Sequence, residues 1–414
     1  MWRIESARIV GALARYTNDF GLAEDVAQEA LAEALQGWPR DGVPPNPAGW
    51  LFTVGRRRAI DAFRRRSALD ERYAALAHGL QDGGVAAGGT SPKSQDPDVL
   101  WDPDAIGDDV LALLFIACHP VLSPEARVGL TLRVVGGLSS EEIARAFLVP
   151  VPTVQARITR AKKTLAAARV PFELPPAEQR RERLGGVLQV LYLIFGEGAN
   201  ATSGQELLRS ELADEARRLI RVLAQLLPGE PEVYGLLALM ELTAARFPAR
   251  VGSDGALVLL EDQDRRRWDH AAIARGRGAL AQAASRGSGL GPYGLQAAIA
   301  SVHAAAASVS ETDWKRIVLL YEALGRIAPS PVVDLNRAVA VSMAYGPQNA
   351  LSIVEGLVAE GRLAGSHLLP SVQGELLARL GRTQEARNEF DKAARLCRNE
   401  RERELLRTKA VRLK

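Results

Sequence analysis

The feature that most constrains the fold is the stretch Leu138–Leu165, LSSEEIARAFLVPVPTVQARITRAKKTL. Either Ser139 or Ser140 can cap a helix here, and the two glutamates that follow are favourable at its positive N-terminal end. Its buried stripe is predicted at Ile143, Ala144 and Phe147. Val149-Pro150 predicts the end of this helix, because proline cannot continue it and disfavours the α conformation in the preceding residue. The spacing therefore predicts a helix-turn-helix.

The second helix of this motif has two faces of opposite character. Pro152 suits its first turn, where a helix tolerates proline. The apolar face repeats at helical spacing through Val154, Ile158, Ala161 and Leu165. The other face is polar and basic, with Thr153, Gln155, Arg157, Arg160, Lys162 and Lys163, and no acidic residue occurs from 152 to 169. Such a helix suits phosphate anchoring and base reading in a DNA groove, and a solvated surface helix is the alternative.

Composition places the chain among ordinary globular proteins. Its 414 residues predict two to four domains, and 47% hydrophobic residues are enough to form their cores. The net charge is only +3, so any signal for nucleic acid must come from local clusters. Many Ala, Leu and Arg residues and few strand-like runs predict an all-α fold.

The cysteine, histidine and acidic residues give little indication of a metal, redox or catalytic site. Cys118 and Cys397 form no metal or redox motif, which favours a reducing compartment. His119 has no metal-spaced partner, and His270, His303 and His367 are isolated in sequence. Four acidic residues could form a metal site, but we favour the interpretation that they form the cap and first turn of a helix that contains Trp268. These acids are Glu261, Asp262, Asp264 and Asp269.

The sequence lacks the motifs of an enzyme and those of a membrane or secreted protein. We find no phosphate loop, nucleophile elbow or paired catalytic acids, so we expect neither an enzyme nor a cofactor or metal. No apolar run approaches the roughly 18 residues of a membrane span, and the charged N-terminus lacks a signal-peptide core. We therefore expect a cytoplasmic protein.

The chain divides into four segments. Residues 1–77 predict a helical bundle, and residues 109–172 predict a second bundle that ends in the helix-turn-helix. Between them, residues 78–108 are rich in Gly, Ala, Asp and Pro, which predicts a flexible acidic linker. From 177 to 414 the sequence predicts helices joined by short Pro/Gly turns.

The end of the chain has a repeat-like pattern. Leu377–Leu396 has a Leu-Gly turn followed by Ala386, Phe390 and Ala393, the small/aromatic/small spacing with which tetratricopeptide helices pack. Val339–Leu357 repeats this pattern upstream, and a weaker pair is predicted from 213 to 227 and from 232 to 245. Stacked hairpins usually form binding surfaces, and a packed helical domain without a ligand is the alternative.

Two patches stand out in the N-terminal bundle. In Leu22–Trp38 one face is apolar, whereas Asp25, Gln28, Glu29 and Leu31 lie on the exposed side, as in any amphipathic helix. In Pro47–Arg66 arginines alternate with aromatic residues, and arginine binds the phosphate backbone. The aromatic residues Trp50, Phe52 and Phe63 either offer faces to unstacked bases or form the core, which is the favoured reading.

Together these segments resemble the sigma-70 family of bacterial RNA polymerase, specifically its extracytoplasmic-function (ECF) group. EDVAQEALAEAL and WLFTVGRRRAIDAFRRR match the two halves of the sigma-2 domain, and GLSSEEIARAFLVPVPTVQARITRAKKTL matches the sigma-4 helix-turn-helix. The rest resembles the ECF subgroup with a tetratricopeptide-like C-terminal extension. The segments that carry this second resemblance are His119–Leu138, Val190–Gly204, Leu259–Asp269, Gly291–Ala304 and Ala328–Val341.

The resemblance implies a promoter-specificity factor that binds core RNA polymerase at its β′ clamp and β flap. It places core-polymerase binding at Asp25, Gln28, Glu29 and Leu31. It places binding of the −10 promoter element at Asn46, Trp50, Arg56, Arg57, Arg64 and Arg65. It places binding of the −35 element at Thr153, Gln155, Arg157, Arg160 and Lys163.

The resemblance also implies that the acidic linker threads toward the RNA exit channel. Its one-sided charge suits a mimic of nucleic acid. The C-terminal domain is a candidate regulator that packs on the first two domains or binds a protein partner. Two alternatives remain open: a one-component DNA-binding regulator with a helical sensor, and a repeat scaffold that does not bind DNA.

Overall fold

The computed structural model describes residues 2–78, 105–147, 149–252, 255–287 and 289–413. Within these ranges the regular elements are helices, and the extended pairing amounts to two isolated bridges. The all-α prediction is confirmed. The chain forms two compact units, residues 1–190 and 191–414, which divide within α8 (Ala177–Ala199). Most of the predicted linker lies outside the described residues, and the predicted domain boundaries stay predictions.

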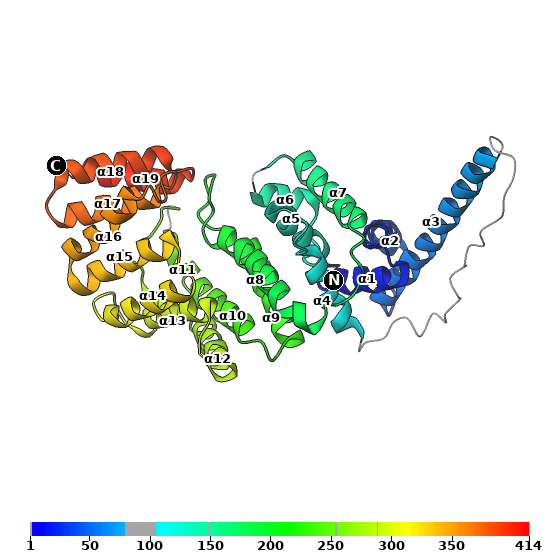
Figure 1. Cartoon of the computed structure of the whole chain (residues 1–414), viewed down its shortest axis with the longest axis horizontal. Coiled ribbons are helices and arrows are strands. Elements are labelled where there is room, and N and C mark those ends of the chain that lie inside the picture. Colours follow the sequence, from blue (N-terminus) through cyan, green and yellow to red (C-terminus); the bar gives the residue numbers. More distant parts are fainter. Residues whose placement is uncertain (1, 79–104, 148, 253–254, 288, 414) are drawn as a thin grey trace. The chain divides into compact units, whose positions relative to one another are not determined.

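The first unit is a bundle of helices of 8 to 32 residues, drawn from blue to green in Figure 1. Their bounds are α1 (Trp2–Thr17), α2 (Phe20–Asp41), α3 (Pro47–His78), α4 (Ala105–Ala117), α5 (Pro124–Val134), α6 (Ser140–Phe147) and α7 (Val151–Ala167). Helix α1 packs against α2, α3 and α4, and α7 packs against α5, α6 and α2. The helix-turn-helix and the N-terminal bundle therefore share one packed body.

Local sequence explains where the two key N-terminal helices begin. The Asp19 side chain caps α2 by accepting a hydrogen bond of 3.0 Å from the Leu22 amide. The Asn46 side chain does the same for α3 through the Gly49 amide, also at 3.0 Å. Gly55 lets α3 approach α1 closely, because a Cβ there would lie 2.7 Å from a methyl carbon of Leu13.

The second unit continues as helices that pack on their neighbours in sequence (Figure 1). Their bounds are α9 (Ser210–Leu226), α10 (Pro231–Ala244), α11 (Phe247–Arg250), the 3-10 helix η2 (Arg265–Arg267), α12 (His270–Arg286), α13 (Pro292–Ala305), α14 (Trp314–Ile327), α15 (Pro331–Tyr345), α16 (Pro347–Ala359), α17 (Leu368–Arg379), α18 (Thr383–Leu396) and α19 (Glu400–Arg412). The predicted pair upstream corresponds to α9 and α10, which pack together.

The packing of α17 on α18 follows the predicted spacing. Ala386, Phe390 and Ala393 are all buried in the core of the second unit. Gly374 lies against the Phe390 ring, where a Cβ would come within 3.1 Å of two ring carbons. The turn between the two helices uses Gly381 at φ 75°, a conformation that favours glycine. Assignment of these hairpins to tetratricopeptide repeats stays a prediction.

The acidic segment before α12 provides two helix caps, but the prediction that Trp268 lies inside a helix is wrong. Asp264 caps η2 through the Arg266 amide, and Asp269 caps α12 through the Ala272 amide. Trp268 lies between the two helices and not inside one. The Trp268 side chain is buried there, and the guanidinium of Arg265 lies 4.9 Å from the centre of its ring. Tertiary packing therefore fixes the position of this indole, which helical spacing could not predict.

In the described part of the chain, no helix combines the length and apolarity that a bilayer crossing requires.

Candidate nucleic-acid and polymerase interface

The helix-turn-helix is built by local capping and a buried seam. The Ser139 amide donates to the Glu142 carboxylate at 2.8 Å, and the Glu142 amide donates to the Ser139 hydroxyl at 3.1 Å, which is a capping box. Helix α6 then ends at Phe147 and α7 begins at Val151. The predicted seam of α7 is confirmed, since Val154, Ile158, Ala161 and Leu165 are buried. Of the α6 stripe, Ile143 and Ala144 are buried and Phe147 is partly exposed.

The outer face of α7 carries the residues predicted to contact the −35 element. Gln155, Arg160 and Lys163 are exposed, and Thr153 and Arg157 are partly exposed. Arg160 donates to the carbonyl oxygen of Ala156 on its own helix at 3.3 Å. None of these three cations forms an ion pair with a residue that the structure describes, so their charges are available to an anionic ligand.

Lys162 does not belong to this outer face, contrary to the sequence prediction. Its side chain is only 17% exposed and contacts two carboxylates of α2, Glu24 and Asp25, the latter at 2.8 Å. Burial alone would lower the pKa of Lys162, but these carboxylates outweigh it and raise the pKa. Helical spacing could not reveal this position, because the acids lie more than a hundred residues away in sequence.

Glu24 is the centre of this contact. It is 4% exposed and also accepts a hydrogen bond of 3.1 Å from the Nε atom of Arg133 on α5. A buried carboxylate needs such partners, because its desolvation is costly. Glu24 is not among the residues predicted from sequence, and its local signal is that of an acid on the apolar side of an amphipathic helix.

The residues predicted to bind core polymerase lie next to this contact on α2. Asp25 is 66% exposed although it pairs with Lys162. Glu29 pairs with Arg58 of α3 at 3.5 Å, and Gln28 and Leu31 are partly exposed. Two of the four predicted residues are therefore held by intramolecular ion pairs.

The arginines of α3 fall into two groups. Arg57 and Arg58 both reach Glu33 of α2, at 3.1 and 2.8 Å. The hydrogen bond from Arg58 is the main reason that the pKa of Glu33 is lowered. Arg56, Arg64 and Arg65 form no ion pair within the described residues, and the last two are exposed. Arg57 is thus held by an ion pair with Glu33, whereas the charges of Arg56, Arg64 and Arg65 are not neutralised by a described residue.

The aromatic residues of α3 lie mainly against the protein. Phe52 is buried, and the Trp50 ring meets Trp38 of α2 edge to face with 5.5 Å between centroids. Both rings fasten α3 to the rest of the bundle, as the favoured reading predicted for the aromatics. Trp50 and Phe63 keep partly exposed surface, and Asn46 is exposed at the start of the helix.

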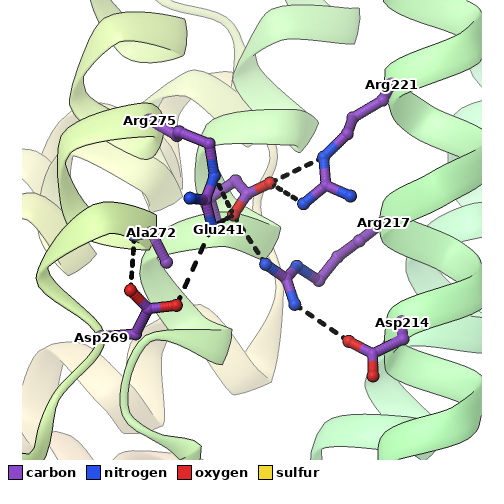
Figure 2. Close-up of polar contacts among 7 residues, drawn as sticks. All are labelled: Asp214, Arg217, Arg221, Glu241, Asp269, Ala272 and Arg275. Atoms are coloured by element: carbon purple, nitrogen blue, oxygen red, sulfur yellow. Dashed lines mark hydrogen bonds and ion pairs between the residues drawn. The ribbon is translucent and has the colours of Figure 1, made fainter.

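A second buried carboxylate, Glu241, lies in the second unit and was also missed from the sequence. It is 1% exposed on α10 and accepts hydrogen bonds from Arg217 and Arg221 of α9 and from Arg275 of α12 (Figure 2). Asp214 and Asp269 pair with two of these arginines from outside. Burial would raise the pKa of Glu241, but the arginines outweigh it and lower the pKa.

Three family models match successive parts of the chain. Sigma-70 region 2 matches residues 2–68, and sigma-70 region 4 matches residues 112–165. A family of unknown function (DUF6596) matches residues 183–284, which include Glu241 and its arginines. The first two matches cover the helices that carry all predicted contacts with polymerase and DNA.

Comparison with curated proteins gives relatives of two kinds. The uncharacterized protein R00370 of Rhizobium meliloti is 45% identical over 402 residues, which cover 94% of this chain and 89% of that protein. The probable ECF RNA polymerase sigma factor SigI of Mycobacterium tuberculosis is 27% identical over 179 residues, covering 43% of this chain and 58% of SigI. The ECF RNA polymerase sigma factor SigK of Mycobacterium ulcerans is 26% identical over 159 residues, covering 38% of this chain and 78% of SigK.

No solved structure matches this chain. The near full-length similarity to R00370 places both proteins in one family, and the sigma-70 regions together with the ECF relatives define its N-terminal part. The chain therefore belongs to the family of R00370 and is an ECF-type sigma factor.

Proposed function

We propose that this chain binds core RNA polymerase and directs it to promoters by contacts with both the −10 and −35 elements. The observation that carries the proposal is the joint presence of regions 2 and 4, each with exposed cations on a helix that form no ion pair with a described residue. Such cations bind phosphates, and neighbouring polar side chains read base edges. Recognition of both elements requires polymerase and takes place in the cytoplasm.

In this proposal α7 enters the major groove of the −35 element. Arg157, Arg160 and Lys163 contact phosphates or bases, and Thr153 and Gln155 lie near the start of the helix, where recognition helices approach base edges. Helix α3 serves the −10 element through Arg56, Arg64 and Arg65, with Trp50 and Asn46 near its start. Arg57 also contacts the −10 element once its ion pair with Glu33 is broken.

Core polymerase binds α2 through Asp25, Gln28, Glu29 and Leu31 in this proposal. Asp25 cannot serve both polymerase and Lys162, and Lys162 sits on the same helix that reads DNA. We infer that binding to polymerase separates α7 from α2, which also frees α7 to reach the −35 element.

We assign a regulatory role to the second unit, acting by contact with the first two regions or with a protein partner. Its stacked helical hairpins support this assignment, since such architectures commonly form binding surfaces. Removal of residues 200–414 should change promoter-specific transcription in cells or in vitro. Unchanged transcription in both settings would contradict the regulatory role and leave the sigma activity intact.

Run-off transcription with sigma-free core polymerase tests the main proposal. Addition of this protein should produce transcripts from discrete start sites, and their mapping yields the promoter sequence. A conventional DNA-binding regulator would bind DNA without giving a specific transcript, and a scaffold would do neither. The double variant R160A/K163A should reduce transcript yield, whereas K315A, which removes an exposed lysine of α14, is the matched control.

A further inference from the structure

Three residues with metal-binding side chains meet where α17, α18 and α19 come together. His367 directly precedes α17, Cys397 directly follows α18, and Glu402 lies in the first turn of α19. The His367 Nε2 atom is 3.4 Å from a Glu402 carboxylate oxygen, and the Cys397 Sγ atom is 3.7 Å from a Glu402 carboxylate oxygen. All three ligand atoms lie within 4.8 Å of one another. His367 is isolated in sequence, but in the structure it lies close to Cys397 and Glu402.

These separations fit a tetrahedral metal ion. Zinc lies about 2.3 Å from a thiolate and about 2.1 Å from imidazole nitrogen or carboxylate oxygen, so its ligand atoms are roughly 3.3–3.6 Å apart. The His367–Glu402 separation of 3.4 Å lies within this range, and the Cys397–Glu402 separation of 3.7 Å is just above it. The third pair, His367 and Cys397, lies within the 4.8 Å that encloses all three ligand atoms, so a bound metal ion would draw these side chains closer together.

Burial gives this group an inner and an outer side. Cys397 is 2% exposed and faces the core of the second unit, whereas the side chains of His367 and Glu402 are each 28% exposed. A metal ion can therefore enter from the outer side and keep one position for water. The whole chain has two cysteines and five histidines. Among the residues that the structure describes, this is the one group of three such ligands so close together.

We propose that His367, Cys397 and Glu402 bind one divalent transition-metal ion of the zinc class. A thiolate and an imidazole together favour zinc and related ions, whereas calcium and magnesium take oxygen ligands only. The alternative is a metal-free cluster, in which the thiol and the imidazole both donate hydrogen bonds to Glu402. These two states differ in the proton on Cys397, which makes them separable by experiment.

Metal binding at this site must release a proton. Cysteine binds a metal ion as its thiolate, whereas a buried thiol without a metal ion keeps its proton at neutral pH. The metal–sulfur bond forms as the sulfur–hydrogen bond breaks, and the proton passes to solvent. The affinity for the metal therefore increases with pH.

The site would also stabilise the end of the second unit. Asn399, between Cys397 and Glu402, donates hydrogen bonds to the carbonyl oxygens of Ala201 and Glu206 at 3.0 and 2.8 Å. A metal ion that holds both flanking residues would fix this connection. Binding to the folded state alone should therefore raise the melting temperature.

Titration of the metal-free, full-length protein with Co²⁺ tests the proposal. One equivalent should produce sulfur-to-cobalt charge-transfer absorption and the visible bands of tetrahedral cobalt, and Zn²⁺ should displace both. C397S should abolish the charge-transfer band, and H367Q and E402Q should weaken zinc binding at least about 100-fold. Circular dichroism should confirm that each variant is folded.

Two variants serve as matched controls. C118S removes the only other cysteine, and E400Q changes a neighbouring exposed acid at the start of α19. Both should retain the cobalt spectrum and the rise in melting temperature with zinc. Absence of a charge-transfer band in the wild type, or its persistence in C397S, would overturn the proposal. A melting temperature unaffected by zinc would do the same and would identify the metal-free cluster. None of these readouts depends on transcription.

Discussion

Lys162 and Lys163 are adjacent in sequence, yet their ammonium groups have opposite environments. Lys162 lies between carboxylates of α2, and Lys163 is exposed without an ion pair to any described residue. A step of one residue turns a helix by about 100°, which suffices to move a side chain from solvent to a neighbouring helix. Residue type alone therefore does not define the proposed DNA-binding face of α7.

This difference predicts that Lys163 contributes to DNA binding through a phosphate. K163A should weaken promoter binding by the holoenzyme similarly for all sequences and reduce the salt dependence, log K against log salt, by about 1. Fluorescence anisotropy over a series of salt concentrations measures this slope. K315A removes an equal charge from α14 and should leave the slope unchanged; an equal reduction in K315A would contradict a local phosphate contact.

At the scale of elements, buried carboxylates join helices that are distant in sequence. Glu24 links α2 to α5 and α7, and Glu241 links α9, α10 and α12 (Figure 2). Each carboxylate avoids the cost of burial through arginine or lysine partners. Removal of one such acid leaves several cations close together without their counter-charge.

E241Q should therefore destabilise the second unit by about 3 kcal/mol, since it breaks a buried charge pair from one side. Urea unfolding followed by circular dichroism measures the loss. D214N is the matched control because it removes an exposed partner of the same arginine cluster. It should cost less than about 1 kcal/mol. Equal losses for the two variants would contradict the central role of Glu241.

The lowered pKa of Glu241 also predicts a dependence of stability on pH. Because the folded-state pKa lies below the ordinary value of 4.5, the ionised group stabilises the fold at neutral pH. This stabilisation should be lost as the pH falls below 4.5 and through the folded-state pKa. Unfolding free energies of the wild type and E241Q, measured from pH 7 to 3, should converge in acid. Parallel curves would contradict the assignment.

At the scale of the whole molecule, the first unit holds the helices proposed to bind polymerase and to read DNA in one packed body. The contact of Lys162 with Glu24 and Asp25 joins the helix proposed to read the −35 element to the helix proposed to bind polymerase. In the function proposed above, this closed arrangement competes with core polymerase, and the population of the open form limits apparent affinity.

K162Q should therefore increase the apparent affinity of the free protein for core polymerase. An exposed ion pair is worth about 1 kcal/mol, or roughly fivefold in affinity, and the gain here should be at least as large because Lys162 is 17% and Glu24 4% exposed. Binding of a fluorescent derivative to core polymerase measures this gain, and K163Q, with the same change one residue away, is the control. If K162Q binds no better than K163Q while remaining folded, the contact does not compete with polymerase.

Much of the fold follows from local sequence. Ser139 and Glu142 predict the start of α6, Val149-Pro150 predicts the break before α7, and the spacing from Val154 to Leu165 predicts its seam. The turn and the small/aromatic/small pattern around Phe390 likewise predict how α17 packs on α18. These signals succeed because caps, turns and helical periodicity act within a few residues.

Sequence by itself thus determined the helical class, the helix-turn-helix and the basic character of α3 and α7. Only the tertiary structure decided which charges are open and which are paired. It turned Lys162 toward Glu24, placed Arg57 on Glu33, surrounded Glu241 with arginines and brought His367 to Cys397 and Glu402. The physical reason is that partners for a buried charge or a metal ion come from distant helices, and a linear pattern contains no record of those distances.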